Sequence, residues 1–453
     1  MGGSVLTRGA ASPEVWEAGP IRHNRELIET EAGKGRELAV LVTLETDGDW
    51  QESLTELERL ADTAGAEVAD VVLQRRDRPD PATFVGKGKA QEVHEAAAAS
   101  GADLVIVHGE LSPLQQRNLE NVVKLPVIDR TGLILDIFAQ RARSNEGKLQ
   151  VELAQLHYTL PRLTGRGVWL SRLGGGIGTR GPGETKLEAD RRRVRRRITA
   201  VTREVEEIRR HRATQRQARQ ASMIPTASLI GYTNAGKSTV LNALSGADAL
   251  VEDKLFATLD PTIRRVALPG GLWILLADTV GFIRNLPHQL VAAFRATFEE
   301  VTYSDLLVHV VDASHPQMDE QMAAVERVLA EIGVPEKPIV TAFNKADAVE
   351  DVETLQMKAR RCVPSVILSA LRGTGLDELR EALAAQARRR LHRVEVLLPL
   401  ERGDLVSLAH ERGRVEIEHY AAEGIELVAH VPGDLAARLA ALDLRAPAPV
   451  EEW

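Results

Sequence analysis

Cysteine and long hydrophobic runs are nearly absent from this sequence. Cys362 is the one cysteine among 453 residues, so an intrachain disulfide is excluded, and closely spaced Cys and His with a zinc-site pattern are missing too. The longest apolar runs, such as residues 272–277, are far below the roughly 18 residues that span a bilayer. Residues 1–20 lack the apolar core of a signal peptide. We therefore expect a cytoplasmic protein in a reducing compartment, without stable membrane association.

Positive charge is concentrated in one segment. Residues 141–220 hold 20 Lys/Arg and 8 Asp/Glu, a net charge of +12; the whole chain carries −8, which leaves −20 for the remainder. A basic segment in an acidic protein indicates contact with a localised polyanion. The alternative is a solvated helix face, which we consider the weaker interpretation because this segment has other unusual features.

The order of apolar segments predicts an α/β protein of several domains. Residues 1–36 are polar and unperiodic, and we expect them to be disordered. Strands that alternate with helices predict an N-terminal α/β domain over residues 37–140 and a second α/β domain over residues 221–392. Residues 393–453 predict a small α+β domain. The Gly-Lys-Gly-Lys string at residues 86–89 lacks the spacing of a nucleotide fingerprint, so a plain turn is favoured there.

Residues 141–220 have the spacing of a coiled coil. Two series of apolar residues follow one another at intervals of four and three positions, with a single interval of seven. They are Leu149, Leu153, Leu156, Leu160 and Leu163, then Leu187, Val194, Ile198, Val201, Val205 and Ile208. Such steps predict an antiparallel hairpin of two helices. The second helix, from about residue 184 to 219, would be roughly 50 Å long at ~1.5 Å per residue. Asn145 and Gly147 are the candidate breaks in the first helix.

The loop at the tip of this predicted hairpin, residues 164–183, contains eight glycines and three arginines. A helix–helix connection needs only about 2–8 residues, so a loop of this length suggests a function. Arginine pairs with phosphate and tryptophan stacks on bases. Residues 191–197 add six arginines in seven positions. We interpret the hairpin as an RNA-binding arm, with a simple turn and an exposed charged helix as the alternatives. The candidate RNA contacts are Arg166, Trp169, Arg172, Arg180, Arg191 and Arg195.

A phosphate loop is predicted at residues 231–238, which read GYTNAGKS. This string lies between a short apolar strand and a helix, which is the context that a P-loop requires. Backbone N–H groups at the helix N-terminus would surround the phosphates. Lys237 would reach the β and γ oxygens, and the Ser238 hydroxyl would ligate Mg²⁺.

Two further strings complete a guanine-nucleotide pattern. Asp278 follows an apolar strand in DTVG, where its carboxylate can reach Mg²⁺ through water and the Gly281 amide can contact the γ-phosphate. Asp347 in NKAD would accept hydrogen bonds from guanine N1–H and N2, which adenine lacks. A buried carboxylate left unpaired with ATP would lose at least 1–3 kcal/mol, so GTP is favoured. Ser369 and Ala370 fit a backbone contact to guanine O6.

These motifs predict a P-loop GTPase domain over residues 221–392, and they leave its switch threonine and its catalytic group open. Thr258 and Thr262, both in FATLDPT, are candidates for the threonine that binds Mg²⁺, and the residues alone do not separate them. Phe282 follows DTVG, where many GTPases have a glutamine that orients the attacking water. The catalytic group is therefore unknown. A partner surface is the favoured source, a monovalent cation held by Asn234 is the second, and Arg284 is the weakest.

With GYTNAGKS, LFATLDPT, DTVGFI, NKAD and the upstream GGGIGTRGPGETKLEADRRR, the chain resembles the HflX family of translational GTP-binding proteins over nearly all of residues 37–450. The resemblance implies that Thr258 is the magnesium threonine, beside Ser238. It also implies GTP/GDP and Mg²⁺ as cofactors. The expected nucleotide contacts are Gly231, Tyr232, Thr233, Asn234, Ala235, Gly236, Lys237, Ser238, Phe256, Ala257, Thr258, Leu259, Asp260, Asp278, Thr279, Val280, Gly281, Asn344, Lys345, Ala346, Asp347, Ser369, Ala370 and Leu371.

The resemblance further implies a monomeric factor that binds the large ribosomal subunit and splits stalled or stressed ribosomes. The ribosome would stimulate GTP hydrolysis, and the glycine-arginine loop would project toward ribosomal RNA at the peptidyl transferase centre. Two alternatives stay open: a ribosome-assembly GTPase, and a non-catalytic RNA-binding silencer in which the nucleotide only stabilises the fold.

Overall fold

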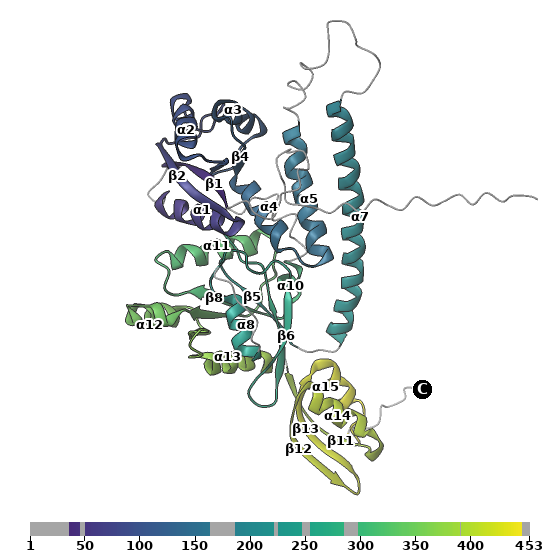
Figure 1. Ribbon diagram of the computed structural model, residues 1–453. Helices are drawn as coiled ribbons and strands as arrows, with labels where there is room; N and C mark the ends of the chain where they lie inside the picture. Colours follow the sequence, from purple (N-terminus) through teal and green to yellow (C-terminus); the bar gives the residue numbers. More distant parts are fainter. Residues whose placement is uncertain are drawn as a thin grey trace, which may run out of the picture.

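The computed structural model describes residues 36–45, 50–163, 186–221, 225–246, 254–284, 298–389 and 391–445. Figure 1 shows three units that contain sheets, with a pair of long helices beside the first two. The extension expected to be disordered lies outside the described residues apart from Arg36. Four of the candidate RNA contacts also lie outside them: Arg166, Trp169, Arg172 and Arg180.

The N-terminal unit is a parallel sheet in the order β2-β1-β3-β4, with helices on both faces. Its elements are β1 (Glu37–Glu45), α1 (Trp50–Ala64), β2 (Ala66–Arg75), α2 (Lys87–Ser100), β3 (Leu104–Val107), α3 (Pro113–Val123) and β4 (Val127–Asp129). The sheet has a hydrophobic core on each face. Neighbouring side chains of β1 pack in different cores, because successive side chains of a strand point to opposite faces. Leu41 shares a core with Leu57 of α1, whereas Val42 shares another with Val93 of α2.

Residues 86–89 form a helix start, so the turn interpretation is wrong. Gly86 directly precedes α2, and its carbonyl accepts the first helical hydrogen bond, from the Ala90 amide at 2.9 Å. Lys87 and Lys89 already lie in the helix. Lysine and the alanines that follow are good helix formers, which favours a helix that begins at this point.

Two helices, not one, follow β4 in the segment predicted to form the first helix of the hairpin. They are α4 (Arg130–Arg141) and α5 (Asn145–Arg162), separated by residues 142–144. The helix is thus interrupted directly before Asn145, whereas Gly147, the other candidate break, lies within α5. Ser144 is the N-cap, and its hydroxyl accepts a hydrogen bond from the Gly147 amide at 2.9 Å, which explains why the helix starts there.

The second helix of the hairpin is α7 (Lys186–Ala221), and it packs beside α5; we call α5 and α7 the arm (Figure 1). Six of the predicted seam residues meet in one apolar cluster: Leu149, Leu153, Leu156, Val201, Val205 and Ile208. Arg197 adds two hydrogen bonds to Glu152 at 2.5 and 2.7 Å. In Figure 1 the arm ends that flank residues 164–185 point away from the C-terminal unit.

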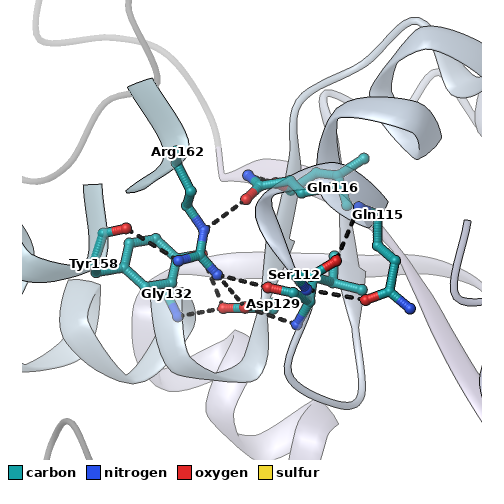
Figure 2. Close-up of polar contacts among 9 residues, drawn as sticks. Ser112, Gln115, Gln116, Asp129, Gly132, Tyr158 and Arg162 are labelled. Atoms are coloured by element: carbon teal, nitrogen blue, oxygen red, sulfur yellow. Dashed lines mark hydrogen bonds and ion pairs between the residues drawn. The ribbon is translucent and has the colours of Figure 1, made fainter. Parts of the chain in front are cut away.

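The last turn of α5 is fastened to the N-terminal unit by a polar network (Figure 2). Arg162 donates to Asp129 and to the Leu111 carbonyl, both at 2.9 Å, and to Gln116 at 2.8 Å. Tyr158 donates to the same Asp129 carboxylate at 2.9 Å. The described end of the arm is therefore held at the carboxyl end of β4.

The middle unit is a sheet in the order β10-β9-β8-β5-β7-β6, parallel except for β6. Its strands are β5 (Thr226–Ile230), β6 (Thr262–Ala267), β7 (Trp273–Asp278), β8 (Leu306–Asp312), β9 (Ile339–Asn344) and β10 (Ser365–Ile367). Its helices are α8 (Lys237–Ser245), α10 (Glu299–Tyr303), α11 (Met318–Glu331), η2 (Ala346–Ala348), α12 (Val352–Arg361) and α13 (Leu376–Arg388).

The C-terminal unit is an antiparallel sheet in the order β11-β13-β12, with helices packed in its core. Its elements are β11 (Leu391–Leu398), η3 (Leu400–Arg402), α14 (Gly403–Arg412), β12 (Arg414–Ala421), β13 (Gly424–Pro432) and α15 (Gly433–Ala440). The architecture is thus the expected α/β protein with a small α+β unit.

One hydrophobic core continues from the N-terminal unit into the middle unit. Phe138 of α4 and Val151 of α5 belong to it, together with Phe256 and Phe282. The rings of Phe138 and Phe256 meet edge to face, with centroids 4.7 Å apart. The segment predicted as a switch is therefore packed directly on α4 and on α5 of the arm. Among the described helices, none has the length and hydrophobicity of a membrane span.

Candidate nucleotide-binding site

The predicted phosphate loop connects β5 to α8 and is held by hydrogen bonds from three sides. Lys237 is buried, and its Nζ donates to the carbonyls of Gly231 and Tyr232 at 3.1 and 2.8 Å. Asn344 of β9 donates to the Ala235 carbonyl at 2.9 Å. The amide of Thr233 donates to the Phe282 carbonyl at 2.7 Å. These bonds hold the loop in place between β5 and α8.

Three oxygen atoms converge at the start of α8. The hydroxyl of Ser238 lies 2.6 Å from Asp278 Oδ2 and 2.9 Å from the Thr258 hydroxyl, which itself lies 2.8 Å from Asp278 Oδ2. Asp278 Oδ1 is buried without a hydrogen-bond partner. Such an orphaned carboxylate oxygen beside two hydroxyls suits Mg²⁺, a cation that prefers oxygen ligands and retains several waters. Thr262 is exposed at the start of β6, so the fold brings Thr258 to this point rather than Thr262.

Burial sets the charge states of this cluster. It lowers the pKa of Lys237 to about 8, with Asp278 opposing the shift, so the ammonium group remains charged at pH 7. Burial also raises the pKa of Asp278, while Lys237 and the two hydroxyls act in the opposite direction. The site therefore presents a cation and a carboxylate that both lack full hydration, and each gains from a charged ligand of opposite sign.

The residues expected at the base lie at the ends of β9 and β10. Asn344 Oδ1 accepts a hydrogen bond from the Ala370 amide at 2.9 Å, which joins the two loops. Asp347 is exposed, not buried as the selectivity argument assumes, and a hydrogen bond from Ser369 is the main cause of its lowered pKa. An exposed carboxylate is hydrated, so the penalty against adenine requires that a bound base cover Asp347. Leu371 is 80% exposed.

Phe282 is fully buried in the hydrophobic core. Its ring stacks on Phe298 with centroids 5.5 Å apart, and its amide donates to the Gly231 carbonyl at 3.1 Å. Arg284, the candidate in the same chain, donates to Gln317 at 2.8 Å and pairs with Glu320 at 3.5 Å. A group that orients water is thus supplied by neither residue in this arrangement.

Sequence reasoning missed a hydrogen-bonded ring that joins the phosphate loop to the N-terminal unit. Tyr232 donates its hydroxyl hydrogen to Glu56, and Glu56 accepts from Arg130 at 2.5 Å. Arg130 also donates to the Arg284 carbonyl at 2.6 Å, while the Arg284 amide donates to the Tyr232 hydroxyl at 2.8 Å. The members lie up to 228 positions apart along the chain, so no local spacing signals the ring.

Two candidate RNA contacts lie on the described part of the arm. Arg195 of α7 is exposed, and Arg191 is half-buried. Neighbouring arginines differ in their environment: Arg193 and Arg196 are exposed, whereas Arg197 faces α5 and pairs with Glu152. The arginine run is therefore divided between a structural face and an exposed face.

Comparison with known families covers most of the chain. Residues 51–139 match the family described as GTP-binding GTPase N-terminal, residues 141–219 the GTP-binding GTPase middle region, and residues 226–345 the 50S ribosome-binding GTPase. The chain is 49% identical over 409 residues to GTPase HflX of Caldanaerobacter subterraneus subsp. tengcongensis, covering 90% of this chain and 94% of that protein. The chain belongs to the HflX family of GTPases.

Another curated relative and a solved structure are also similar to this chain. GTPase HflX of Escherichia coli (strain K12) is 46% identical over 390 residues, covering 86% of this chain and 92% of that protein. A crystal structure of a GTP-binding protein from the archaeon Sulfolobus solfataricus in complex with GDP is 27% identical, with a TM-score of 0.43, and covers 78% of this chain and 99% of that chain. As a member of the HflX family, the chain is a nucleotide-binding GTPase.

This HflX-family GTPase also contains a buried histidine next to its nucleotide site. His309 lies in the central strand β8, where burial lowers its pKa to about 4 and the charge of Lys237 acts in the same direction. In the unfolded chain the pKa of His309 is about 6.5, so below this pH the unfolded chain binds a proton there and the folded chain does not. The free energy of unfolding therefore falls as the pH decreases toward 4. Between pH 7 and pH 5 the expected loss is about 2 kcal/mol.

Denaturant unfolding of the wild type and of His309→Asn at several pH values checks this prediction. The variant cannot titrate in this range, so its free energy of unfolding should change less between pH 7 and pH 5. Equal changes in the two proteins would show that His309 does not titrate as its burial requires.

Proposed function

We propose that the converging oxygens of Ser238, Thr258 and Asp278 form the magnesium site of this GTPase. Ser238 and Thr258 would ligate the ion directly, and Asp278 would hold it through water. Bound there, Mg²⁺ would neutralise charge on the phosphates. Lys237 and the amides at the start of α8 would bind the phosphates, since a helix N-terminus favours anions. Asn344, Asp347, Ser369 and Ala370 would surround guanine.

The catalytic group would come from outside the described site. Phe282 is buried and Arg284 is engaged elsewhere, so hydrolysis by the free protein should be slow. We infer that a partner surface supplies the group that orients water. A monovalent cation beside Asn234 remains the second candidate, and it predicts potassium-dependent hydrolysis without any partner.

We infer that the partner is the large ribosomal subunit and that the activity is the splitting of stalled or stressed ribosomes. The observation that carries this inference is the arm. Its helix α7 presents exposed arginines such as Arg195, while α5 packs on the predicted switch in one shared core. Basic side chains bind the phosphate backbone of RNA. The arm would enter ribosomal RNA near the peptidyl transferase centre, and GTP would favour the bound state.

Deleting residues 165–183 tests this function. The deletion leaves every described residue of the nucleotide site in place, so the free protein should retain its GTP affinity. Ribosome-stimulated hydrolysis and splitting should both be lost, as measured by phosphate release and by sedimentation of stalled ribosomes. Unaltered splitting would exclude the arm as the functional element.

A charge-matched pair of variants controls for general electrostatics. Arg172→Ala/Arg180→Ala removes two charges from the glycine-arginine segment. Arg360→Ala/Arg361→Ala removes two exposed charges from the end of α12. Both double variants lower net charge equally. Only the first should weaken binding to large subunits and reduce its salt dependence.

Two experiments separate the alternatives. A nonhydrolysable GTP analogue should support splitting but not release of the factor, and a strict need for hydrolysis would contradict the proposal. Loss of an assembly GTPase would leave immature large particles, whereas loss of a splitting factor would leave intact stalled ribosomes. A non-catalytic silencer predicts no rise in GTP hydrolysis when purified ribosomes are added.

A further inference from the structure

One short segment connects the proposed magnesium threonine to the base of the arm. In residues 255–260, Thr258 turns toward Ser238 and Asp278, whereas Phe256 and Leu259 are buried in the core shared with α4 and α5. Phe256 has a φ of +53°, a strained value for a phenylalanine, which indicates that its surroundings hold it there. Opposite sides of the segment thus serve the nucleotide site and the arm.

Asp260 binds the residues that begin α5. Its Oδ2 accepts hydrogen bonds from the amides of Arg143 and Ser144, at 2.9 and 2.7 Å, and its Oδ1 accepts one from the Ser144 hydroxyl. That hydroxyl in turn accepts from the Gly147 amide at 2.9 Å as the N-cap of α5. A carboxylate at a helix N-terminus also interacts favourably with the helix dipole.

Gly147 leaves the room that this contact needs. A Cβ atom placed on Gly147 would lie 2.4 Å from Asp260 Oδ1, closer than two such atoms can approach. Gly147 is buried in the first turn of α5, where alanine would be the better helix former. The glycine is unfavourable for the helix itself, and the approach of Asp260 gives it a physical reason.

We propose that Asp260 is a positioning residue that couples the nucleotide site to the arm, because it joins Thr258, two residues away, to the N-cap of α5. The contact exists while Thr258 lies against Ser238 and Asp278, so it supports the arrangement that contacts Mg²⁺ and GTP. Coupling between two sites is reciprocal. Substitutions at the base of the arm therefore change the preference for GTP over GDP, although these residues do not contact the nucleotide loops.

The experiment measures the dissociation constants of GDP and of a nonhydrolysable GTP analogue for the full chain without ribosomes. Asp260→Ala removes the carboxylate, and Gly147→Ala displaces it. Each lowers the ratio of the GDP constant to the GTP-analogue constant by about tenfold, within the usual range of allosteric coupling. Ser144→Ala lowers the ratio by a smaller factor, because the two backbone donors remain. The Asp260→Ala/Gly147→Ala double variant has the same ratio as Asp260→Ala alone, because the carboxylate that Gly147→Ala would displace is already absent.

Ser112→Ala is the matched control. Ser112 is the N-cap of α3 in the N-terminal unit, and its hydroxyl accepts a hydrogen bond from the Gln115 amide at 3.2 Å. Among the described residues 254–262 of the switch segment, none binds it. This variant loses a cap of the same chemistry and keeps the wild-type ratio. Gly147→Ala improves helix propensity whereas Asp260→Ala removes a cap interaction, so a shared fall in the ratio cannot arise from helix stability.

The inference rests on the proposed role of Thr258. The variant Thr258→Ala shows whether a negative result contradicts that role or only the coupling through Asp260. If Thr258→Ala leaves the ratio unchanged, the assignment of the magnesium threonine is wrong. If Thr258→Ala lowers the ratio while Asp260→Ala and Gly147→Ala keep it within about twofold of wild type, the coupling through Asp260 is overturned. Hydrogen exchange at the first turn of α5 gives a second readout: it changes with the bound nucleotide in the wild type and not in Asp260→Ala.

Discussion

Replacing Gly231 with alanine is expected to abolish nucleotide binding and to destabilise the GTPase unit by about 2–5 kcal/mol. A Cβ at this position would lie 2.1 Å from the Val310 carbonyl oxygen, which is backbone in the central strand β8 and cannot move aside. The φ of Gly231 is +148°, which side chains rarely adopt. Its carbonyl also accepts from Phe282 and Lys237, so a displaced backbone disturbs both.

Gly246→Ala is the control for this substitution. Gly246 also has a positive φ, of +67°, but a Cβ there would meet open space after α8. The expected loss is about 1 kcal/mol, from backbone strain alone, with nucleotide affinity retained. Fluorescent GDP titration and denaturant unfolding measure both quantities. Equal behaviour of the two variants would contradict the argument, since it would mean that the contact with Val310 has no consequence.

The phosphate loop could be read from the sequence because its chemistry is contiguous. Lys237 and Ser238 follow a glycine-rich turn, and the strand before them and the helix after them are encoded within a few residues. Asp278 and Asn344 are recognisable for the same reason, since each ends a buried strand. Parallel strands bring their carboxyl ends to one edge of a sheet, so order along the chain is enough to place these groups together.

Contacts between units could not be read in this way. The choice between Thr258 and Thr262 depends on which hydroxyl faces Asp278, and the residues alone leave both open. Asp260 and Gly147 are ordinary in their local sequence, and their meeting depends on how the segment after α8 packs on α5. The break before Asn145 has the same origin, because the cap of α5 is completed by Asp260 from another unit.

Removing the Asp129 carboxylate should have the second large effect, on the attachment of the arm. Asp129 is fully buried and accepts four hydrogen bonds, from the Leu111 and Gly132 amides at 3.1 and 2.8 Å, and from Tyr158 and Arg162 at 2.9 Å (Figure 2). Asp129→Ala leaves the guanidinium of Arg162 without its carboxylate in a site where it is only 16% exposed. Breaking a buried ion pair in this way removes about 3–5 kcal/mol.

Two milder variants and hydrogen exchange test this assignment. Tyr158→Phe removes one hydrogen bond and should lose about 1 kcal/mol. Asp319→Ala breaks an ion pair with Lys358 at the surface, where such pairs contribute about 0–1 kcal/mol. Denaturant unfolding should show a far larger loss of unfolding free energy for Asp129→Ala than for either of the other variants. Faster exchange should appear in the last turn of α5 in Asp129→Ala alone, because Arg162 and Tyr158 fasten that turn to the N-terminal unit. Similar small losses in all three variants would mean that the arm is held by its apolar seam and not by this network.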